Sequence, residues 1–307
     1  MTLTKEKVIE IAKDNGLDIL ADSLTYNESG LDFLVVFAED AKGEEWVLRF
    51  PRREDVMAST NKEKLTLELI GTKLNVEAPN WKIYTDSLIA YKKLSGVPAA
   101  TIDPKAQAYV WVLDEKNVST VFNETLAEAL VSLHRIEHEE ARSAGLPVET
   151  PEDIRENMAK RMEKVKENFD VDPDLWQRWQ NWLNDYSVWP KQTALVHGDL
   201  HAGHILIDEE NKVTGLIDWT EAVVGDIAID FVAHYRTFGE DVLKELIHHY
   251  EKAGGYVWPG MAQHVMELTA AYPIAIAEFA IKSGLEEYME MAKQVLGSIP
   301  NNPITQS

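Results

Sequence analysis

The sequence of 307 residues contains no cysteine, few basic residues and no long apolar run. Without cysteine the chain has no disulfide bonds, no thiolate nucleophile and no zinc-thiolate site. It carries 30 lysine and arginine residues against 52 aspartate and glutamate residues, a net charge of −22. Because this charge would repel nucleic-acid phosphates, we expect no nucleic-acid partner. No apolar run is long enough to span a membrane and no basic-apolar leader is present, so we expect a cytoplasmic monomer without a membrane partner.

The most informative stretch is HGDLHAGHILI at residues 197–207, which is followed by LIDWTEA around Asp218. The apolar end of the first stretch and the apolar run at 213–217 are joined by a polar turn, which predicts a β-hairpin. A hairpin brings its open ends together and would place Asp199, His204 and Asp218 near one point. A single loop aspartate is usually a turn residue, but three converging ligand-type side chains indicate a site.

This spacing resembles the catalytic loop of the protein-kinase-like phosphotransferases, in which His-x-Asp is followed by two metal ligands. His204 stands five positions after Asp199, and Asp218 stands fourteen positions after His204. The HGDLH form is similar to the small-molecule branch of this family rather than to protein kinases. The histidine at position 204 and the segment ILIDEENKVTGLIDWTEA look most like the macrolide 2′-phosphotransferases.

The chemistry that this resemblance implies suits the residue types. Phosphoryl transfer needs a carboxylate that accepts the hydroxyl proton, and ligands that hold Mg²⁺ across the phosphates. The resemblance makes Asp199 the base and Asp218 a Mg²⁺ ligand, whose hard oxygen suits the ion. It makes His204 the second ligand by position, although imidazole favours softer metals. His197 would support the loop.

The spacing from Asp226 to Asp230, GDIAID, matches the same family a second time. In that family the second aspartate opens a buried helix and accepts hydrogen bonds from the catalytic-loop backbone. The resemblance gives this supporting role to Asp230. Asp226 would cap the N-terminus of the same helix.

The resemblance implies an α+β, bilobal, kinase-like fold, with a small lobe at residues 1–93 that holds a five-stranded antiparallel sheet and a helix. Strands at 34–37 and 46–50 form a hairpin in this lobe. Asn27, Ser29 and Gly30 fall in the loop that covers the nucleotide phosphates in the family, although Asn-Glu-Ser-Gly is also an ordinary turn.

Arg49 stands where protein kinases have a phosphate-binding lysine. A guanidinium can serve there because it forks onto phosphate oxygens and keeps its charge. Glu63 follows fourteen residues later, on the first turns of a helix expected at 59–74, and the resemblance pairs it with Arg49. The alternative is a solvated glutamate on a helix rich in lysine and glutamate.

Residues 94–99 contain Gly96 and Pro98 and predict a hinge between two lobes. In kinase-like folds the hinge backbone binds the nucleotide base. Leu94 matches the hinge donor, and Tyr91 matches the residue that closes the back of the base pocket. A phenol there leaves little room for the 6-amino group of adenine, so we expect GTP to be preferred over ATP.

Residues 100–307 predict a larger helical lobe that carries the catalytic loop. We expect helices at 122–140, 238–251 and 258–296, the last kinked at Pro273. His134 and His138 stand one turn apart without a third ligand, and we interpret them as solvent-facing. A large apolar antibiotic with one ammonium needs apolar walls and a carboxylate. The pocket candidates are Phe231, Tyr235, Tyr272, Ile274 and Glu278, and plain helix packing explains each of them equally well.

These patterns lead to one hypothesis with two alternatives. The hypothesis is a Mg²⁺-dependent transfer of the γ-phosphate of GTP, or of ATP, to the 2′-hydroxyl of a macrolide amino sugar, which would confer resistance. The first alternative is a kinase of the same fold for another small cationic substrate, such as an aminoglycoside, choline or homoserine. The second is a non-catalytic kinase-like binding protein. Such proteins usually lack the base or the metal-binding aspartate, and both residue types are present here.

Overall fold

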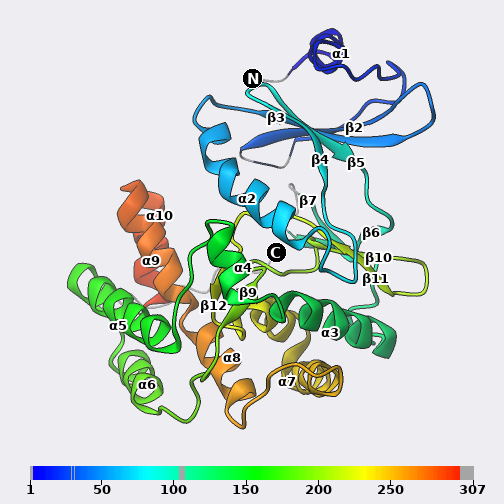
Figure 1. Cartoon of the computed structure of the whole chain (residues 1–307). Helices are drawn as coiled ribbons and strands as arrows, with labels where there is room; N and C mark the ends of the chain where they lie inside the picture. The colour runs from blue at the N-terminus through cyan, green and yellow to red at the C-terminus, as the bar shows by residue number, and fades with distance from the viewer. Residues whose placement is uncertain (1–2, 29, 31, 104–107, 298–307) are drawn as a thin grey trace.

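The computed structural model describes residues 3–28, 30, 32–103 and 108–297, so Ser29 lies outside the described residues. Figure 1 shows a sheet with two helices at the top of the molecule and a larger, mainly helical part below it. The fold is a kinase-like α+β fold, as the resemblance implied. Within the described residues, none of the helices combines the length and apolar composition that a membrane crossing needs.

The upper part contains one antiparallel sheet of five strands in the order β1-β2-β3-β5-β4. This confirms the predicted five-stranded sheet. The strands are β1 (Thr25–Asn27), β2 (Phe33–Glu39), β3 (Glu45–Pro51), β4 (Trp81–Thr85) and β5 (Leu88–Lys92). Thr4 caps the N-terminus of helix α1 (Lys5–Asp14), because its side chain accepts a hydrogen bond from the Lys7 backbone N–H.

Alternation along the strands gives this sheet two different faces. Leu48 of β3 and Ala90 of β5 pack with Val8 of α1 in one apolar cluster. Their neighbours Val47 and Tyr91 point the other way, into a second cluster that includes Val56, the first residue of helix α2 (Val56–Ile70). Arg49 is two residues beyond Val47 on the same strand and therefore lies on this second face, which is turned toward the rest of the molecule.

Helix α2 (Val56–Ile70) packs against this second face. It begins three residues earlier and ends four residues earlier than the range 59–74 that we expected, so Glu63 lies in its middle rather than on its first turns. Residues at helical spacing are buried, among them Thr60, Glu63, Leu67 and Ile70. The helix thus turns a carboxylate, not only apolar groups, toward the sheet.

The segment that leads from β5 into the helical part is held by Glu77, which lies in the loop between α2 and β4. Its carboxylate accepts hydrogen bonds from the backbone N–H (2.7 Å) and hydroxyl (3.2 Å) of Ser95. Its backbone bonds to Thr214 O and Leu216 N, both in β11 (Val213–Leu216). The Thr214 hydroxyl donates to Ser95 O at 2.8 Å. The hinge segment is therefore fixed to the strand that leads to Asp218.

The lower part holds the remaining helices and several short strands. The helices are α3 (Thr120–His134), α4 (His138–Ser143), α5 (Pro151–Asn168), α6 (Pro173–Asn184), α7 (Ile229–Lys252), α8 (Met261–Ala270), α9 (Tyr272–Ser283) and α10 (Glu286–Val295). The strands are β6 (Val97–Pro98), β7 (Ala100–Asp103), β8 (Ala108–Trp111), β9 (Ala194–Val196), β10 (Ile205–Ile207), β11 and β12 (Val223–Gly225). Strand β6 pairs with β10, so the end of the hinge segment is held beside the hairpin that β10 and β11 form.

Three expected helices of the lower part also differ in extent from the observed ones. The helix expected at 122–140 is divided after His134 into α3 and α4. The helix expected at 258–296 is three helices, because Pro273 lies in the first turn of a new helix and Gly284 ends that helix with φ 64°. Helix α7 begins at Ile229, and Gly239 with φ 83° interrupts it. Apolar periodicity continues across such breaks because helices on both sides of a break bury residues in a shared core.

Candidate active site

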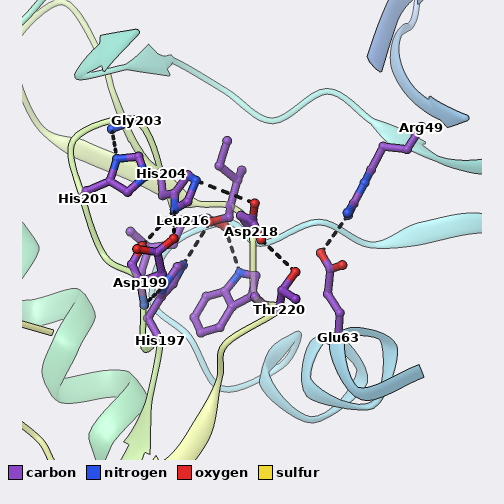
Figure 2. Close-up of polar contacts among 12 residues, drawn as sticks. Arg49, Glu63, His197, Asp199, His201, Gly203, His204, Leu216, Asp218 and Thr220 are labelled. Atoms are coloured by element: carbon purple, nitrogen blue, oxygen red, sulfur yellow. Dashed lines mark hydrogen bonds and ion pairs between the residues drawn. The ribbon is translucent and has the colours of Figure 1, made fainter. Parts of the chain in front are cut away.

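Three ligand-type side chains meet at the end of the predicted hairpin. Strands β10 and β11 pair antiparallel and form the predicted hairpin, in which Leu206 lies opposite Gly215. His204 lies between the two carboxylates (Figure 2), with Nδ1 3.8 Å from Asp199 Oδ2 and Nε2 3.7 Å from Asp218 Oδ2. The catalytic-loop residues and the residue after β11 therefore form one polar cluster, although they are up to nineteen positions apart.

The hydrogen bonds of His204 determine which ring nitrogen is available. Nδ1 lies 2.9 Å from the backbone oxygen of Asp199, and a carbonyl can only accept, so Nδ1 carries the proton. Nε2 then presents its lone pair toward Asp218. The Thr220 hydroxyl donates to Asp218 Oδ1 at 2.9 Å and leaves Oδ2 on the side of His204. One imidazole nitrogen and one carboxylate oxygen thus fit a shared divalent cation, with the imidazole oriented by a backbone carbonyl.

The buried ring of His197 connects the backbone of Asp199 with the backbone of Ile217, the residue before Asp218. It is fully buried, its Nε2 donates to Ile217 O at 3.0 Å, and its Nδ1 accepts from the Asp199 backbone N–H at 3.3 Å. Burial lowers the pKa of His197, in keeping with one nitrogen acting as donor and the other as acceptor. The ring therefore fixes the backbone of Asp199 relative to the segment that carries Asp218.

His201, to which the sequence assigned no role, packs directly on His204. The two ring centroids are 3.9 Å apart, and His201 Nδ1 accepts from the Gly203 backbone N–H at 3.0 Å. Burial lowers the pKa of His201 to about 4, which keeps the ring neutral near pH 7. Ligand atoms of Asp199, His201 and His204 all lie within 4.8 Å of one another. The three histidines within the eight residues HGDLHAGH were the signal that could have drawn attention to His201.

Asp230 holds the catalytic loop from the first turn of α7. Its two oxygens accept from the backbone N–H groups of His197 and Gly198, each at 2.9 Å. A third donor is His134 Nε2 at 3.1 Å, and His134 Nδ1 lies 2.8 Å from the Tyr250 hydroxyl. Burial raises the pKa of Tyr250, so its phenol keeps the proton that it donates to His134.

The interpretation of His134 and His138 as solvent-facing is wrong. The His134 side chain is only 3% exposed, and His138 Nε2 bonds to Thr193 O at 2.8 Å. His134 continues the buried helical stripe of Ala127 and Leu130, and this spacing was the available signal. Its partner Asp230 is 96 positions away, so periodicity within one helix could not identify the bond.

Asp226 does not cap α7 as expected. The N-cap residue of α7 is Ala228, and no side chain caps the helix. Asp226 Oδ1 instead accepts from the Ala228 N–H at 3.0 Å, and Oδ2 lies 2.7 Å from Nε2 of the buried His264. His264 in turn accepts from the indole N–H of Trp182 at 3.1 Å. Asp226 therefore connects the turn before α7 to α8 and α6.

Arg49 and Glu63 form the ion pair that the resemblance implied. Arg49 Nη1 lies 2.8 Å from Glu63 Oε1, and the Glu63 side chain is 1% exposed, which excludes the alternative of a solvated glutamate. Burial raises the pKa of Glu63, and Asp218 raises it further against the attraction of Arg49. Figure 2 shows the pair directed toward the Asp218 side of the cluster. A guanidinium oriented in this way has further N–H donors for an anion.

The remaining residues that the sequence suggested for nucleotide binding are Asn27, Gly30, Tyr91 and Leu94, and Tyr91 lies on the same face of the sheet as Arg49. Asn27 and Gly30 are exposed, and Arg52 donates to Gly30 O at 2.9 Å. Tyr91 is buried, and burial raises the pKa of its phenol to about 12. Leu94 is half-buried, and within the described residues no hydrogen bond engages its backbone N–H or C=O. These two backbone groups are therefore available to a bound base.

Two of the five pocket candidates cannot contact a substrate in this structure. Phe231 and Ile274 are 0% exposed, because each lies on the inner side of its helix and fills the core. Tyr235 is half-buried against the same core. Tyr272 is exposed, with the Arg236 guanidinium 4.3 Å from its ring centroid, and Glu278 pairs with Arg161 at 2.7 Å.

Comparison with known proteins agrees with this geometry. The model of the phosphotransferase enzyme family matches residues 23–264. The uncharacterized protein YcbJ of Bacillus subtilis (strain 168) is 43% identical over 291 residues, 95% of each chain. Macrolide 2′-phosphotransferase MphH from Brachybacterium faecium superposes with a TM-score of 0.91 at 33% identity, covering 96% of this chain and 98% of its own. A macrolide 2′-phosphotransferase type I gives 0.85 at 39%, covering 96% and 99%. With its catalytic hairpin, ion pair and loop support in place, the chain belongs to the phosphotransferase enzyme family.

Proposed function

We propose that the protein transfers the γ-phosphate of a nucleoside triphosphate to the 2′-hydroxyl of the amino sugar of a macrolide antibiotic, and that this transfer confers resistance. The observation that carries the proposal is the meeting of Asp199, His204 and Asp218, with the Arg49–Glu63 pair directed toward them. The similarity in fold and sequence to two macrolide 2′-phosphotransferases, over 96% of the chain, supports the choice of acceptor.

Each residue of the cluster has a defined task in this proposal. Asp199, whose side chain is 56% exposed, accepts the proton of the attacking hydroxyl. Arg49 binds the phosphates, and Glu63 orients Arg49 through their short ion pair. Asp230 keeps Asp199 in place by binding the two preceding backbone N–H groups. The positions of these groups, rather than covalent chemistry, supply most of the catalysis in such reactions.

His204 Nε2 and Asp218 Oδ2 would hold a divalent cation, and we propose Mg²⁺. A bound Mg²⁺ supplies positive charge that neutralises the phosphate oxygens during transfer. The proton on His204 Nδ1 and the Thr220 hydroxyl orient these two ligands from outside. The carboxylate suits a hard ion such as Mg²⁺, whereas imidazole favours softer metals, so the choice of ion rests on Asp218.

We propose that residues 1–93 bind the nucleotide, that 94–99 form the hinge, and that 100–307 carry the catalytic loop and the acceptor. Leu94 would bind the base through its two available backbone groups. Tyr91 would close the back of the base pocket, because it is buried on the same sheet face as Arg49. A phenol at this place disfavours the 6-amino group of adenine, so GTP is the proposed donor and ATP the weaker one.

The test compares acceptors and one matched pair of variants. Purified protein is incubated with GTP or ATP and Mg²⁺ in the presence of erythromycin, kanamycin or choline, and phosphorylated product is measured by mass. Turnover with erythromycin alone is the expected result. Turnover with kanamycin or choline instead would favour a kinase for a small cationic substrate, a class that the net charge of −22 also suits.

The Asp199→Asn variant identifies the base. It should lower kcat by about 10² to 10⁴, the usual contribution of a general base, with nucleotide affinity nearly unchanged. Glu209→Gln, in the exposed turn of the same hairpin, makes the same chemical change away from the cluster and should retain activity. A loss of less than about tenfold in Asp199→Asn would show that Asp199 is not the base.

A further inference from the structure

The guanidinium of Arg49 lies between two aromatic rings that come from different strands. Its central carbon is 4.4 Å from the centroid of the Phe33 ring and 5.6 Å from the centroid of the Trp81 ring. Phe33 belongs to β2 and Trp81 to β4, which lie on opposite sides of β3 and β5 in the sheet. Both rings pack in the apolar cluster on the face of the sheet that is turned toward the helical part. Neither ring was among the residues that the sequence suggested for nucleotide binding.

Trp81 is itself held by a line of contacts that ends on α2. Its ring stacks on the Tyr84 ring, with 5.4 Å between the centroids and 21° between the planes. The hydroxyls of Tyr84 and Thr60 are 3.0 Å apart and share a hydrogen bond. Thr60 precedes Glu63 by three residues on α2, so both side chains lie on one side of the helix. The helix that supplies the carboxylate of the ion pair therefore also supports one of the two rings.

The indole N–H of Trp81 indicates that the ring, rather than the N–H, accounts for a tryptophan at this position. The N–H is buried and has no acceptor among the described residues, an arrangement that lowers stability. By contrast, the indole N–H groups of Trp46, Trp182 and Trp219 each have an acceptor. What holds Trp81 is the contact of its ring with its neighbours, and one of these neighbours is the guanidinium of Arg49.

An arginine gains more from two flanking rings than a lysine would. A guanidinium is planar, is weakly hydrated and stacks on aromatic faces, whereas an ammonium is a compact and strongly hydrated charge. Glu63 binds one end of the guanidinium through Nη1 at 2.8 Å, and the rings restrict its rotation about that bond. The remaining N–H groups then keep a fixed direction, which suits the oxygens of a phosphate. With 13% of its side chain exposed, Arg49 can still reach a ligand.

We propose that Phe33 and Trp81 are positioning residues that hold the guanidinium plane of Arg49 for the phosphates of the nucleotide. This inference rests on the proposed function, in which Arg49 binds the phosphates, and it adds the groups that orient this arginine. The rings act through Arg49 and therefore on the phosphates, and not on the base or on the acceptor. Loss of a ring should weaken the binding of GTP and leave the binding of guanosine, which has no phosphate, unchanged.

The test compares matched variants on the two faces of the sheet. Trp81→Leu and Phe33→Leu remove the rings beside Arg49, and Trp46→Leu and Phe50→Leu make the same changes in the apolar cluster on the opposite face. Dissociation constants are measured by titration with GTP in the presence of Mg²⁺, and with guanosine. Trp81→Leu and Phe33→Leu should each raise the Kd of GTP by about 3- to 30-fold, as expected for loss of a cation–π contact, with the Kd of guanosine within about twofold of wild type. The variants on the opposite face should keep both constants.

Two further measurements separate positioning from support of the fold. Urea denaturation should show lower stability in the variants of both faces, because each change leaves a cavity in an apolar cluster. Trp81→Phe keeps a ring beside Arg49 and removes the unpaired N–H, so it should bind GTP within about twofold of wild type. Phe33→Leu removes less volume than Trp81→Leu and decides the test if Trp81→Leu does not fold.

Three outcomes would overturn the inference. The first is unchanged GTP binding in Phe33→Leu and in Trp81→Leu. The second is an equal loss of affinity for GTP and guanosine, and the third is an equal loss of GTP affinity in Trp46→Leu and Phe50→Leu. Because no acceptor is present in these titrations, a wild type that binds GTP but phosphorylates no macrolide would refute the proposed acceptor alone. A wild type that binds no GTP would refute both the proposed function and the inference.

Discussion

Replacement of Asp230 by asparagine should weaken both the fold and the reaction. The Asp230 carboxylate is buried and accepts three hydrogen bonds, from the backbone N–H groups of His197 and Gly198 and from His134. Asparagine offers one carbonyl oxygen, and its NH₂ group would face one of the remaining donors. At least one buried donor then lacks an acceptor, which costs about 1–3 kcal/mol, and the charge-assisted part of the other bonds is also lost. We expect the free energy of unfolding to fall by about 2–5 kcal/mol.

Urea denaturation of matched variants measures this loss. Asp241→Asn makes the same chemical change on an exposed residue of the same helix, and its free energy of unfolding should stay within about 0.5 kcal/mol of wild type. The kinetics give a second readout. Asp199 is left intact, but its backbone loses support, and displacement of a reacting group by about 1 Å can cost about 10² in kcat. If Asp230→Asn unfolded at the same urea concentration as Asp241→Asn, the carboxylate would not hold the loop.

Three further predictions concern the metal, the base pocket and pH. Asp218→Asn should weaken Mg²⁺-dependent nucleotide binding, measured by Mg²⁺ titration at fixed GTP, and an unchanged Mg²⁺ requirement would remove Asp218 from the ligands. Tyr91→Ala should raise kcat/KM for ATP relative to GTP by about 10- to 200-fold, and equal changes would leave the preference to the hinge backbone. Burial lowers the pKa of His234 to about 4, while an unfolded histidine protonates below about 6.5. The unfolded state then binds more protons between these values, so wild type loses stability as the pH falls from 7 to 5. Urea denaturation should show this loss to be smaller by about 2 kcal/mol in His234→Leu, and unchanged in the exposed control His248→Leu.

The cluster of Asp199, His204 and Asp218 could be predicted from the sequence, because it depends on residues that are close together in the chain. Residues 197–218 form a hairpin whose turn and strands are set by neighbours in the chain, so the meeting of Asp199 and Asp218 follows from register. The resemblance supplied the pairing of Arg49 with Glu63, which are fourteen positions apart and on different elements. The resemblance also supplied the five-stranded antiparallel sheet, whose two faces both carry apolar clusters.

The parts that depend on packing between distant segments were not predictable in the same way. Phe231 and Ile274 read as pocket walls because they are apolar and follow the catalytic hairpin, yet both face the core. The sequence pattern specifies that a helix has an apolar side but not whether protein or ligand covers that side.

The hydrogen bonds of Glu77 have a mechanical consequence for the nucleotide. Both backbone groups of Ser95 are engaged, and a Cβ at Gly96 would lie 2.6 Å from Ile207 O, so the backbone there is held against β10. The loop after α2 is held to the same part of the molecule, because Glu77 bonds to β11 and the C-terminal half of α2 packs in the lower core through Leu67 and Ile70. Glu63 lies on this anchored helix and pairs with Arg49. The guanidinium proposed to bind the phosphates is therefore positioned from two directions, by strand β3 of the sheet and by a helix that is tied to the part of the molecule that carries Asp199.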